Sequence, residues 1–181
     1  ATRLHVARSF ARLSRATEGT LAETARLRAV ETFLSVARDP EASERARFWS
    51  DGELSGLYLD ARRTDEALAL ARRALTGADR AGDTLAAYRA GRVLALSLEA
   101  NGDRAGALDV MRRVADQGER LRRDRLVEGV GDTVGSPTAG AMTSEARSTT
   151  GRYLSMLLDE VELGDDGDRQ TRLREVRDPV S

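Results

Sequence analysis

The sequence predicts an all-α protein, built as a short α-solenoid of antiparallel helix pairs with an additional C-terminal helix. The first reason is an internal repeat: residues 66–75 (EALALARRAL) align with residues 106–115 (GALDVMRRVA) at an offset of 40 positions. A fixed period of about 20 to 50 residues is typical of repeat architectures. The second reason is composition, since only 4% of the residues are aromatic and Ile is absent. Ala and Leu must then build most of the core, which favours closely packed helices over a sheet.

Composition and charge narrow the range of partners. The net charge is -1, so neither nucleic acid nor an anionic membrane is an expected partner. The chain contains no Cys, which excludes disulfides, thiolate metal sites and a thiol nucleophile. No apolar run approaches the roughly 20 residues that a membrane-spanning helix needs, and the start lacks the apolar core of a secretory signal. A cytoplasmic location is therefore expected. The missing initial Met indicates that the chain is processed or is a piece of a longer protein.

Apolar spacing and capping residues predict three helices before residue 63. The apolar residues of 4–15 largely follow helical spacing. Thr20 and Glu23 have the form of a capping box, in which the hydroxyl and the carboxylate satisfy free backbone N–H groups at a helix start. The helix they open should end near Asp39. Because Asp caps helix starts and Pro fits the first turn, the next helix is expected from Pro40 to about residue 62.

Two glycines, Gly52 and Gly56, lie inside this third predicted helix. Each weakens a helix by about 1 kcal/mol relative to Ala. Either the helix breaks near residues 50–52, or the glycines allow a neighbouring helix or a ligand to come close.

Acidic starts and turn residues predict the next three helices. Residues 64–66 (TDE) place negative charge at the positive end of a helix dipole, so a fourth helix should begin there and run to about residue 79. Gly and Asp at 82–83 precede a fifth helix over 84–100. Asn101 and Gly102 form a strong turn signal, after which a sixth helix should extend from about 103 to 125 or 130.

The character of the chain changes after this helix. Residues 131–143 are rich in Gly, Ser and Thr and have no apolar period, which predicts a flexible loop. A last helix over 144–163 carries a stripe of Leu and Val, and we expect it to cap the repeats or to form a dimer surface. Residues 164–181 are interpreted as a charged tail.

The helix pairs, with small residues at fixed places, resemble the tetratricopeptide repeat. In that family a small residue lies early in the second helix and another follows seven positions later, while the first helix carries a Leu followed four residues on by an aromatic residue. These places fall on Ala67, Ala74, Leu54 and Tyr58, then on Ala107, Val114, Leu94 and Leu98, and more weakly on Ala25 and Ala29.

The resemblance covers residues from about 4 to 125, within a repeat region 1–130 that divides into approximately 4–39, 40–82 and 83–125. The spacing of 40 to 42 residues exceeds the common 34, the usual Trp position holds Asp51 and Gly91, and the closing Pro is missing. The longer spacing looks like the divergent repeats of bacterial signalling regulators.

The resemblance implies that the first helix of each pair lines a concave binding surface. An acidic peptide or helix would suit it, because Arg grips a carboxylate with a planar pair of donors, while Trp49 and Phe10 offer apolar anchors. The alternative is that Trp49 and Phe10 are simply core residues and the Arg side chains simply solvated. The implied surface consists of Phe10, Ser14, Arg45, Trp49, Gly52, Gly56, Leu59, Arg89, Arg92, Leu96 and Glu99.

Other candidate sites favour structural explanations. His5 is the only histidine, and without Cys it is expected to be a surface residue rather than a zinc ligand. The Asp cluster at 165–168 lacks the spacing of a calcium-binding EF-hand loop, and the glycines of 129–135 match neither the Walker nor the dinucleotide pattern. The Arg-rich run 119–125 is interleaved with acidic residues, which predicts ion pairing along a solvated helix face. We therefore expect no metal, no cofactor and no catalytic residue.

These patterns together predict a non-catalytic protein- or peptide-binding module, acting as a scaffold or as the sensing part of a larger bacterial regulatory protein. Two alternatives stay open. One is a helical domain that forms homodimers through the 144–163 helix and has no peptide ligand. The other is the non-catalytic fragment of a multidomain signalling enzyme.

Overall fold

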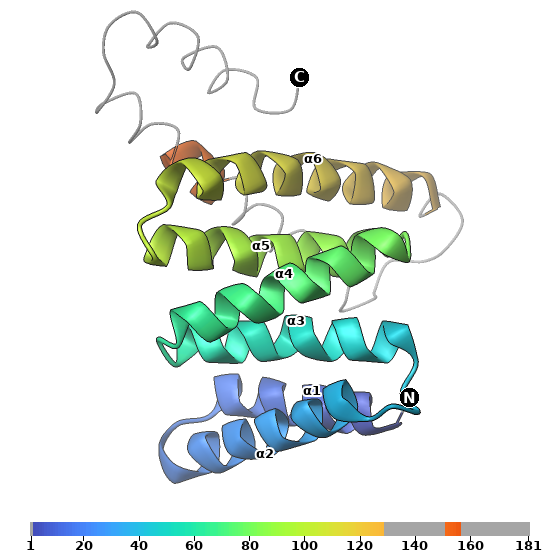
Figure 1. The fold of residues 1–181 in the computed structure, drawn as a ribbon, viewed down its shortest axis with the longest axis vertical. Coiled ribbons are helices and arrows are strands. Elements are labelled where there is room, and N and C mark those ends of the chain that lie inside the picture. Colours follow the sequence, from blue (N-terminus) through green and yellow to red (C-terminus); the bar gives the residue numbers. More distant parts are fainter. Residues whose placement is uncertain (1, 129–150, 157–181) are drawn as a thin grey trace, which may run out of the picture. The chain divides into compact units, whose positions relative to one another are not determined.

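The computed structural model describes residues 2–128 and 151–156, and every secondary-structure element assigned in them is a helix (Figure 1). Contacts divide the chain into two compact units, Ala1–Asp103 and Arg104–Ser181. The second unit contains α6 (Arg104–Glu128) and a further helical segment at residues 151–156. The first unit contains α1 (Thr2–Ala16), α2 (Gly19–Arg38), α3 (Glu44–Asp60), α4 (Thr64–Arg80) and α5 (Thr84–Ala100).

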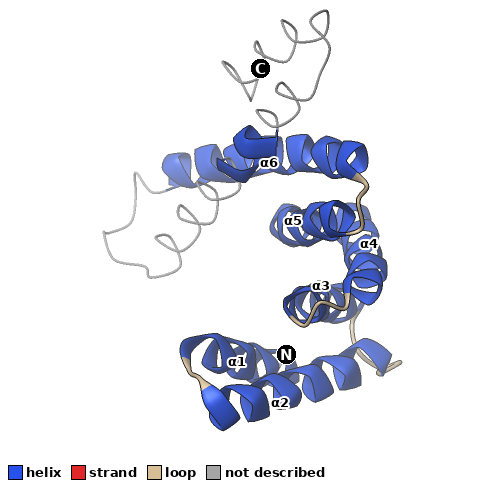
Figure 2. Ribbon diagram, turned by 90° about the vertical axis from the view of Figure 1, so that its left-hand side faces the viewer, coloured by secondary structure: helices blue, strands red, loops and turns tan. Residues whose placement is uncertain are grey.

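The helices of the first unit pack consecutively, α1 on α2, α2 on α3, α3 on α4 and α4 on α5. In addition α3 contacts α5 and α1 contacts α3, so the first members of the predicted pairs also touch one another. Figure 2 shows α3 and α5 side by side with α4 packed against both. The predicted all-α, repeat-like fold is thus confirmed, although α5 and α6 of the third predicted pair belong to different units.

Small side chains let the helices of the first unit approach closely. On α4 the residues Ala67, Ala71, Ala74 and Ala78 recur at helical spacing and are all buried. One core cluster joins α1, α2 and α3 around Phe33. A second cluster comprises Phe48, Trp49, Ala78, Ala86 and Ala87, from α3, α4 and α5.

The predicted capping box at Thr20 and Glu23 is wrong. The helix α2 already begins at Gly19, and its N-cap residue Glu18 makes no side-chain capping hydrogen bond. Gly19 has a φ of 68°, a left-handed conformation that glycine adopts without steric cost. The helix therefore begins two residues too early for Thr20 to be its N-cap.

The start of α3 also differs from the prediction, lying at Glu44 and not at Pro40. The Ser43 side chain accepts a hydrogen bond from the Ala46 N–H at 3.2 Å and so caps α3. Asp39 instead closes a separate turn, in which its Oδ1 atom accepts the Glu41 N–H at 3.0 Å. Both Asp39 and Ser43 are good capping residues, and the later one caps α3.

The glycines of α3 do not break the helix. A Cβ added at Gly52 would lie 3.6 Å from the Ala74 Cβ atom of α4, which is an ordinary contact distance, so the α3–α4 spacing does not require glycine at this position. A tighter contact, not anticipated from the sequence, occurs at Gly77 of α4, where an added Cβ would lie 2.8 Å from the Phe48 Cβ atom. The close packing of α3 on α4 therefore requires glycine at residue 77 and not at residue 52.

In the second unit, the N-terminal half of α6 buries Ala107, Met111 and Val114. The Arg112 Nε atom donates a hydrogen bond to the Tyr153 hydroxyl at 3.2 Å, which connects α6 to the segment 151–156. Those six residues are helical, as predicted for the helix over 144–163. The rest of that predicted helix, the loop 131–143 and the tail 164–181 lie outside the described residues.

None of the helices in residues 2–128 and 151–156 combines the length and the apolar character needed to cross a membrane.

Candidate binding site

Three helices bring Arg8, Trp49 and Arg89 together. Arg8 comes from α1, Trp49 from α3 and Arg89 from α5. The Arg8 Cζ atom lies 4.3 Å from the centroid of the Trp49 ring, and the Arg89 Cζ atom lies 5.7 Å from the same centroid. Both distances are within the range in which a guanidinium cation is attracted by an aromatic face. The two cations therefore lie against one indole ring.

Glu53 is the carboxylate of this group. It follows Trp49 by four residues, so both side chains lie on one face of α3. The Arg8 Nε atom donates a hydrogen bond to Glu53 Oε1 at 3.2 Å, while the Arg89 Nη1 atom is 3.7 Å from the same oxygen. We call Arg8, Trp49, Glu53 and Arg89 the Trp49 cluster. It holds two positive charges and one negative charge.

Burial makes this excess of positive charge costly. The Glu53 side chain is 16% exposed, and the Arg8 Nη2 and Arg89 Nε atoms are buried without a hydrogen-bond partner among the described residues. Desolvation by burial lowers the pKa of Arg8, and the neighbouring Arg89 cation lowers it further, against the opposing effect of Glu53. An unsatisfied buried donor costs about 1–3 kcal/mol, and more when it is charged. The cluster thus has unused donors for a further acceptor.

Asp83 accepts a hydrogen bond from the indole N–H of Trp49. The Trp49 Nε1 atom donates a hydrogen bond to Asp83 Oδ2 at 3.1 Å, and the Arg45 Nη2 atom lies 3.0 Å from that oxygen. The second carboxylate oxygen accepts the Ala86 N–H at 3.1 Å and so caps α5. One carboxylate therefore orients the indole, begins α5 and holds the exposed Arg45 beside the cluster.

The structure brings three of the predicted surface residues together, namely Arg45, Trp49 and Arg89. Trp49 is only 9% exposed and belongs to a core cluster, so it contributes a buried platform more than an open anchor. Phe10 is partly buried against the core cluster of Phe33. That these residues bind a peptide stays a prediction.

The other predicted positions are spread along α1, α3 and α5. The Ser14 hydroxyl donates to the Ala11 carbonyl oxygen at 2.9 Å, within its own helix, and the Arg92 Cζ atom lies 5.9 Å from the Tyr88 ring centroid. Leu59, Leu96 and Glu99 are half-buried. An added Cβ at Gly52 would face α4, and one at Gly56 would lie 4.0 Å from Val93 of α5.

Sequence reasoning missed Arg8 and Glu53. Glu53 could have been found from its spacing, because it lies one helical turn after Trp49 on the same face. Arg8 had no such signal, since its contact with α3 joins residues 45 positions apart.

The remaining candidate sites have structural roles or fall outside the described residues. His5 is exposed on α1, and no group of three or more potential metal ligands occurs within residues 2–128 and 151–156. Glu119 accepts hydrogen bonds from Arg122 at 2.9 and 2.6 Å, which confirms ion pairing at the start of the run 119–125. The acidic cluster at 165–168 and the glycines of 129–135 are not described.

The Trp49 cluster contains more cationic donor groups than carboxylates. Two guanidinium groups, each able to donate several hydrogen bonds, share Glu53 over a buried aromatic ring. Comparison with known proteins gives no further identification: no protein-family model, no curated protein and no solved structure matches the chain.

Proposed function

We propose that this chain is a non-catalytic peptide-binding module, and that the Trp49 cluster receives a carboxylate of its partner. The observation that carries the proposal is the excess of donors: two guanidinium groups with unsatisfied buried N–H groups share one carboxylate. A second carboxylate would neutralise the remaining charge and could accept hydrogen bonds from the exposed part of the Arg89 side chain.

Arg89 is the residue best suited to bind the incoming carboxylate. Its side chain is 40% exposed, whereas that of Arg8 is 27% exposed. The Arg89 contact to Glu53 is also the longer one, at 3.7 Å against 3.2 Å. Arg89 can therefore rotate toward a partner while Arg8 keeps Glu53 neutralised.

Arg45 offers a second cation beside the cluster. Its side chain is 73% exposed and it shares Asp83 with the Trp49 ring. A peptide with two acidic side chains could contact Arg89 and Arg45 together, which favours an acidic segment over a single small anion. The likeness to tetratricopeptide repeats supports the same choice, and a scaffold or sensing role in a larger bacterial regulator is part of this proposal.

A peptide array tests the proposal. The intact chain is applied to an array of short acidic and neutral peptides, and each hit is synthesised again with Gln in place of Glu and Asn in place of Asp. The Arg89→Gln variant should weaken the hits about tenfold or more, since a hydrogen bond to a charged group contributes about 1.5–3 kcal/mol.

Arg28→Gln is the matched control, because it removes the same charge from an exposed pair with Glu31 on α2. Its affinity for the hits should equal that of the intact chain. Hits that bind Arg89→Gln as tightly as the intact chain, or that keep their affinity after loss of their carboxylates, would overturn the proposal.

A further inference from the structure

A cavity lies between α3 and α4, and its lining includes no residue of the Trp49 cluster. It is shallow and has a volume of about 370 Å³. Four of its lining residues are arginines, and two are carboxylates, so its lining has an excess of two positive charges. The charged lining residues are Glu44, Arg47, Asp51, Arg72, Arg73 and Arg80.

The floor of the cavity is the contact between Gly77 and Phe48. Because an added Cβ at Gly77 would lie 2.8 Å from Phe48, the position must stay without a side chain for the helices to keep this spacing. Arg73 and Arg80 are four residues before and three residues after Gly77, so they lie on the same face of α4. Along α4, the Gly77–Phe48 contact thus has one arginine on each side.

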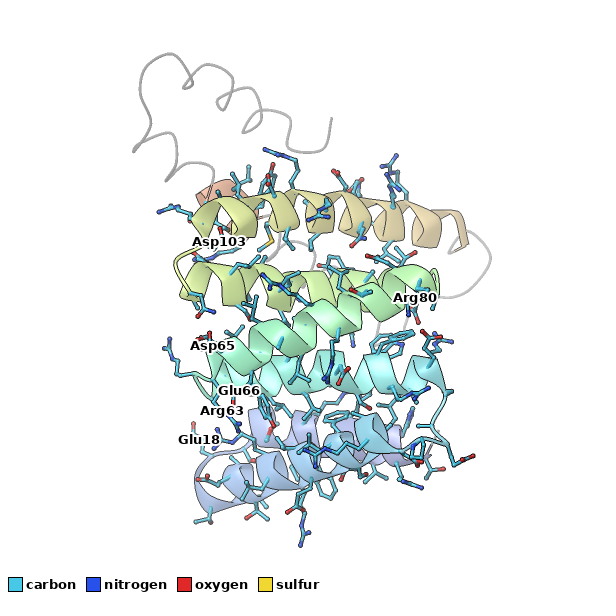
Figure 3. All side chains as sticks on the ribbon, viewed as in Figure 1. Glu18, Arg63, Asp65, Glu66, Arg80 and Asp103 are labelled. Atoms are coloured by element: carbon cyan, nitrogen blue, oxygen red, sulfur yellow. The ribbon has the colours of Figure 1, made fainter. Side chains whose placement is uncertain are left out.

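Ion pairs between the helices occupy the two ends of the cavity. Arg73 grips Asp51 with two atoms, Nη2 at 2.8 Å from Oδ1 and Nε at 3.2 Å from Oδ2. At the other end the Arg80 Nη1 atom lies 3.6 Å from Glu44 Oε1. Figure 3 shows Arg80 at the opposite end of α4 from Asp65 and Glu66. Both lining carboxylates are therefore already paired.

The two remaining arginines have no such partner. Arg47 from α3 and Arg72 from α4 line the same cavity, and within residues 2–128 and 151–156 neither side chain makes a hydrogen bond or an ion pair. Because they come from different helices, Arg47 lines the cavity on the α3 side and Arg72 on the α4 side. Two unpaired guanidinium groups that line one cavity match an anion with two negative charges.

We propose that this cavity binds a phosphate group, either as free phosphate or as a phosphomonoester. The planar N–H donors of Arg47 and Arg72 each suit two phosphate oxygens, and the dianion balances the two unpaired charges. Arg73 and Arg80 are kept in place by their carboxylates and add positive potential at both ends. The site uses none of the cation side chains of the Trp49 cluster, so it is independent of the peptide-binding function.

Isothermal titration calorimetry tests this site with the full chain. Inorganic phosphate and O-phosphoserine are titrated at constant ionic strength and at a pH at least about one unit above the second pKa of each probe, where both are dianions. That pKa is about 6 for a phosphomonoester and higher for inorganic phosphate. The intact chain should bind at one saturable site. The double variant Arg47→Gln/Arg72→Gln should lose about tenfold or more in affinity, and sodium chloride alone should not reproduce the heat.

The double variant Arg113→Gln/Arg120→Gln is the matched control, since it removes two charges from exposed residues of α6 and should bind like the intact chain. Tighter binding of phosphoserine identifies a phosphomonoester as the ligand, and binding of inorganic phosphate alone identifies the free anion; either supports the site. No saturable heat from either probe, or an equal loss in both double variants, would overturn it.

Discussion

Gly77 of α4 packs directly against Phe48 of α3, and a Cβ at residue 77 would lie 2.8 Å from the Phe48 Cβ atom. We expect Gly77→Ala to destabilise the protein by about 1–3 kcal/mol, because overpacking outweighs the gain in helix propensity of about 1 kcal/mol. Gly52→Ala is the matched variant, since its Cβ would meet Ala74 at an ordinary 3.6 Å. It should be neutral or stabilising. The Tm of each variant can be measured by thermal denaturation followed by circular dichroism. A lower Tm for Gly52→Ala than for Gly77→Ala would contradict this account.

The single carboxylate of the Trp49 cluster should matter more for stability than either of its cations. Glu53→Gln leaves two partly buried guanidinium groups without a counter-charge, so we expect a loss of about 2–4 kcal/mol. Arg89→Met leaves the closer Arg8–Glu53 pair intact and should cost less than about 1 kcal/mol. Chemical denaturation can be followed through the fluorescence of Trp49, the only tryptophan of the chain. Equal losses in the two variants would contradict the shared-carboxylate geometry.

Asp83 combines a helix cap with a hydrogen bond to Trp49. Asp83→Ala removes both, so we expect a loss of about 2 kcal/mol, about 1 kcal/mol from the cap and about 1 kcal/mol from the hydrogen bond. Ser43→Ala removes only the cap of α3 and should cost about 1 kcal/mol. The Trp49 emission should change in the Asp83 variant and stay the same in the Ser43 variant. Thr20→Ala should leave stability almost unchanged, because Thr20 caps no helix.

Acid should weaken the start of α4. Arg63 Nε donates a hydrogen bond to Glu66 Oε1 at 3.0 Å, and this bond lowers the pKa of Glu66 from its ordinary value of 4.5. Because the folded-state pKa is the lower one, the charged pair stabilises the fold above pH 4.5 and the effect is lost as the pH falls through the folded-state pKa. The difference in Tm between the intact chain and Glu66→Gln should therefore shrink in acid, and also in high salt. A difference that is independent of pH would contradict this prediction.

Local signals in the sequence were sufficient for most helices. The fifth helix was predicted over 84–100 and is observed at Thr84–Ala100, because Asp83 and Asn101 mark its two ends with residues that favour caps and turns. The start of α2 was misplaced because that helix begins without a side-chain cap, and the start of α3 because two good capping residues, Asp39 and Ser43, lie close together. Ser43 and Asp39 have similar intrinsic preferences, so the choice between them depends on where the packed helix must begin.

The sequence placed some residues of the candidate site and missed others. Helical periodicity and the family resemblance placed Trp49 and Arg89 on first helices of neighbouring pairs, and both lie in the cluster. Glu53 was missed although it lies one helical turn after Trp49. Arg8 was missed because its pairing with α3 depends on the position of α1 along the axis of α3. A displacement of one turn would move Arg8 by about 5.4 Å and break its hydrogen bond.

The order of residues alone thus specifies that this chain forms helices, where most of them begin and end, and which face of each is apolar. These properties follow from interactions between residues a few positions apart, which propensity and periodicity describe well. Only the packed structure decides that Gly77 meets Phe48, that two arginines share Glu53, and that Arg47 and Arg72 line one cavity. Those contacts join residues on different helices, so they depend on the relative position of whole helices, which no short sequence pattern encodes.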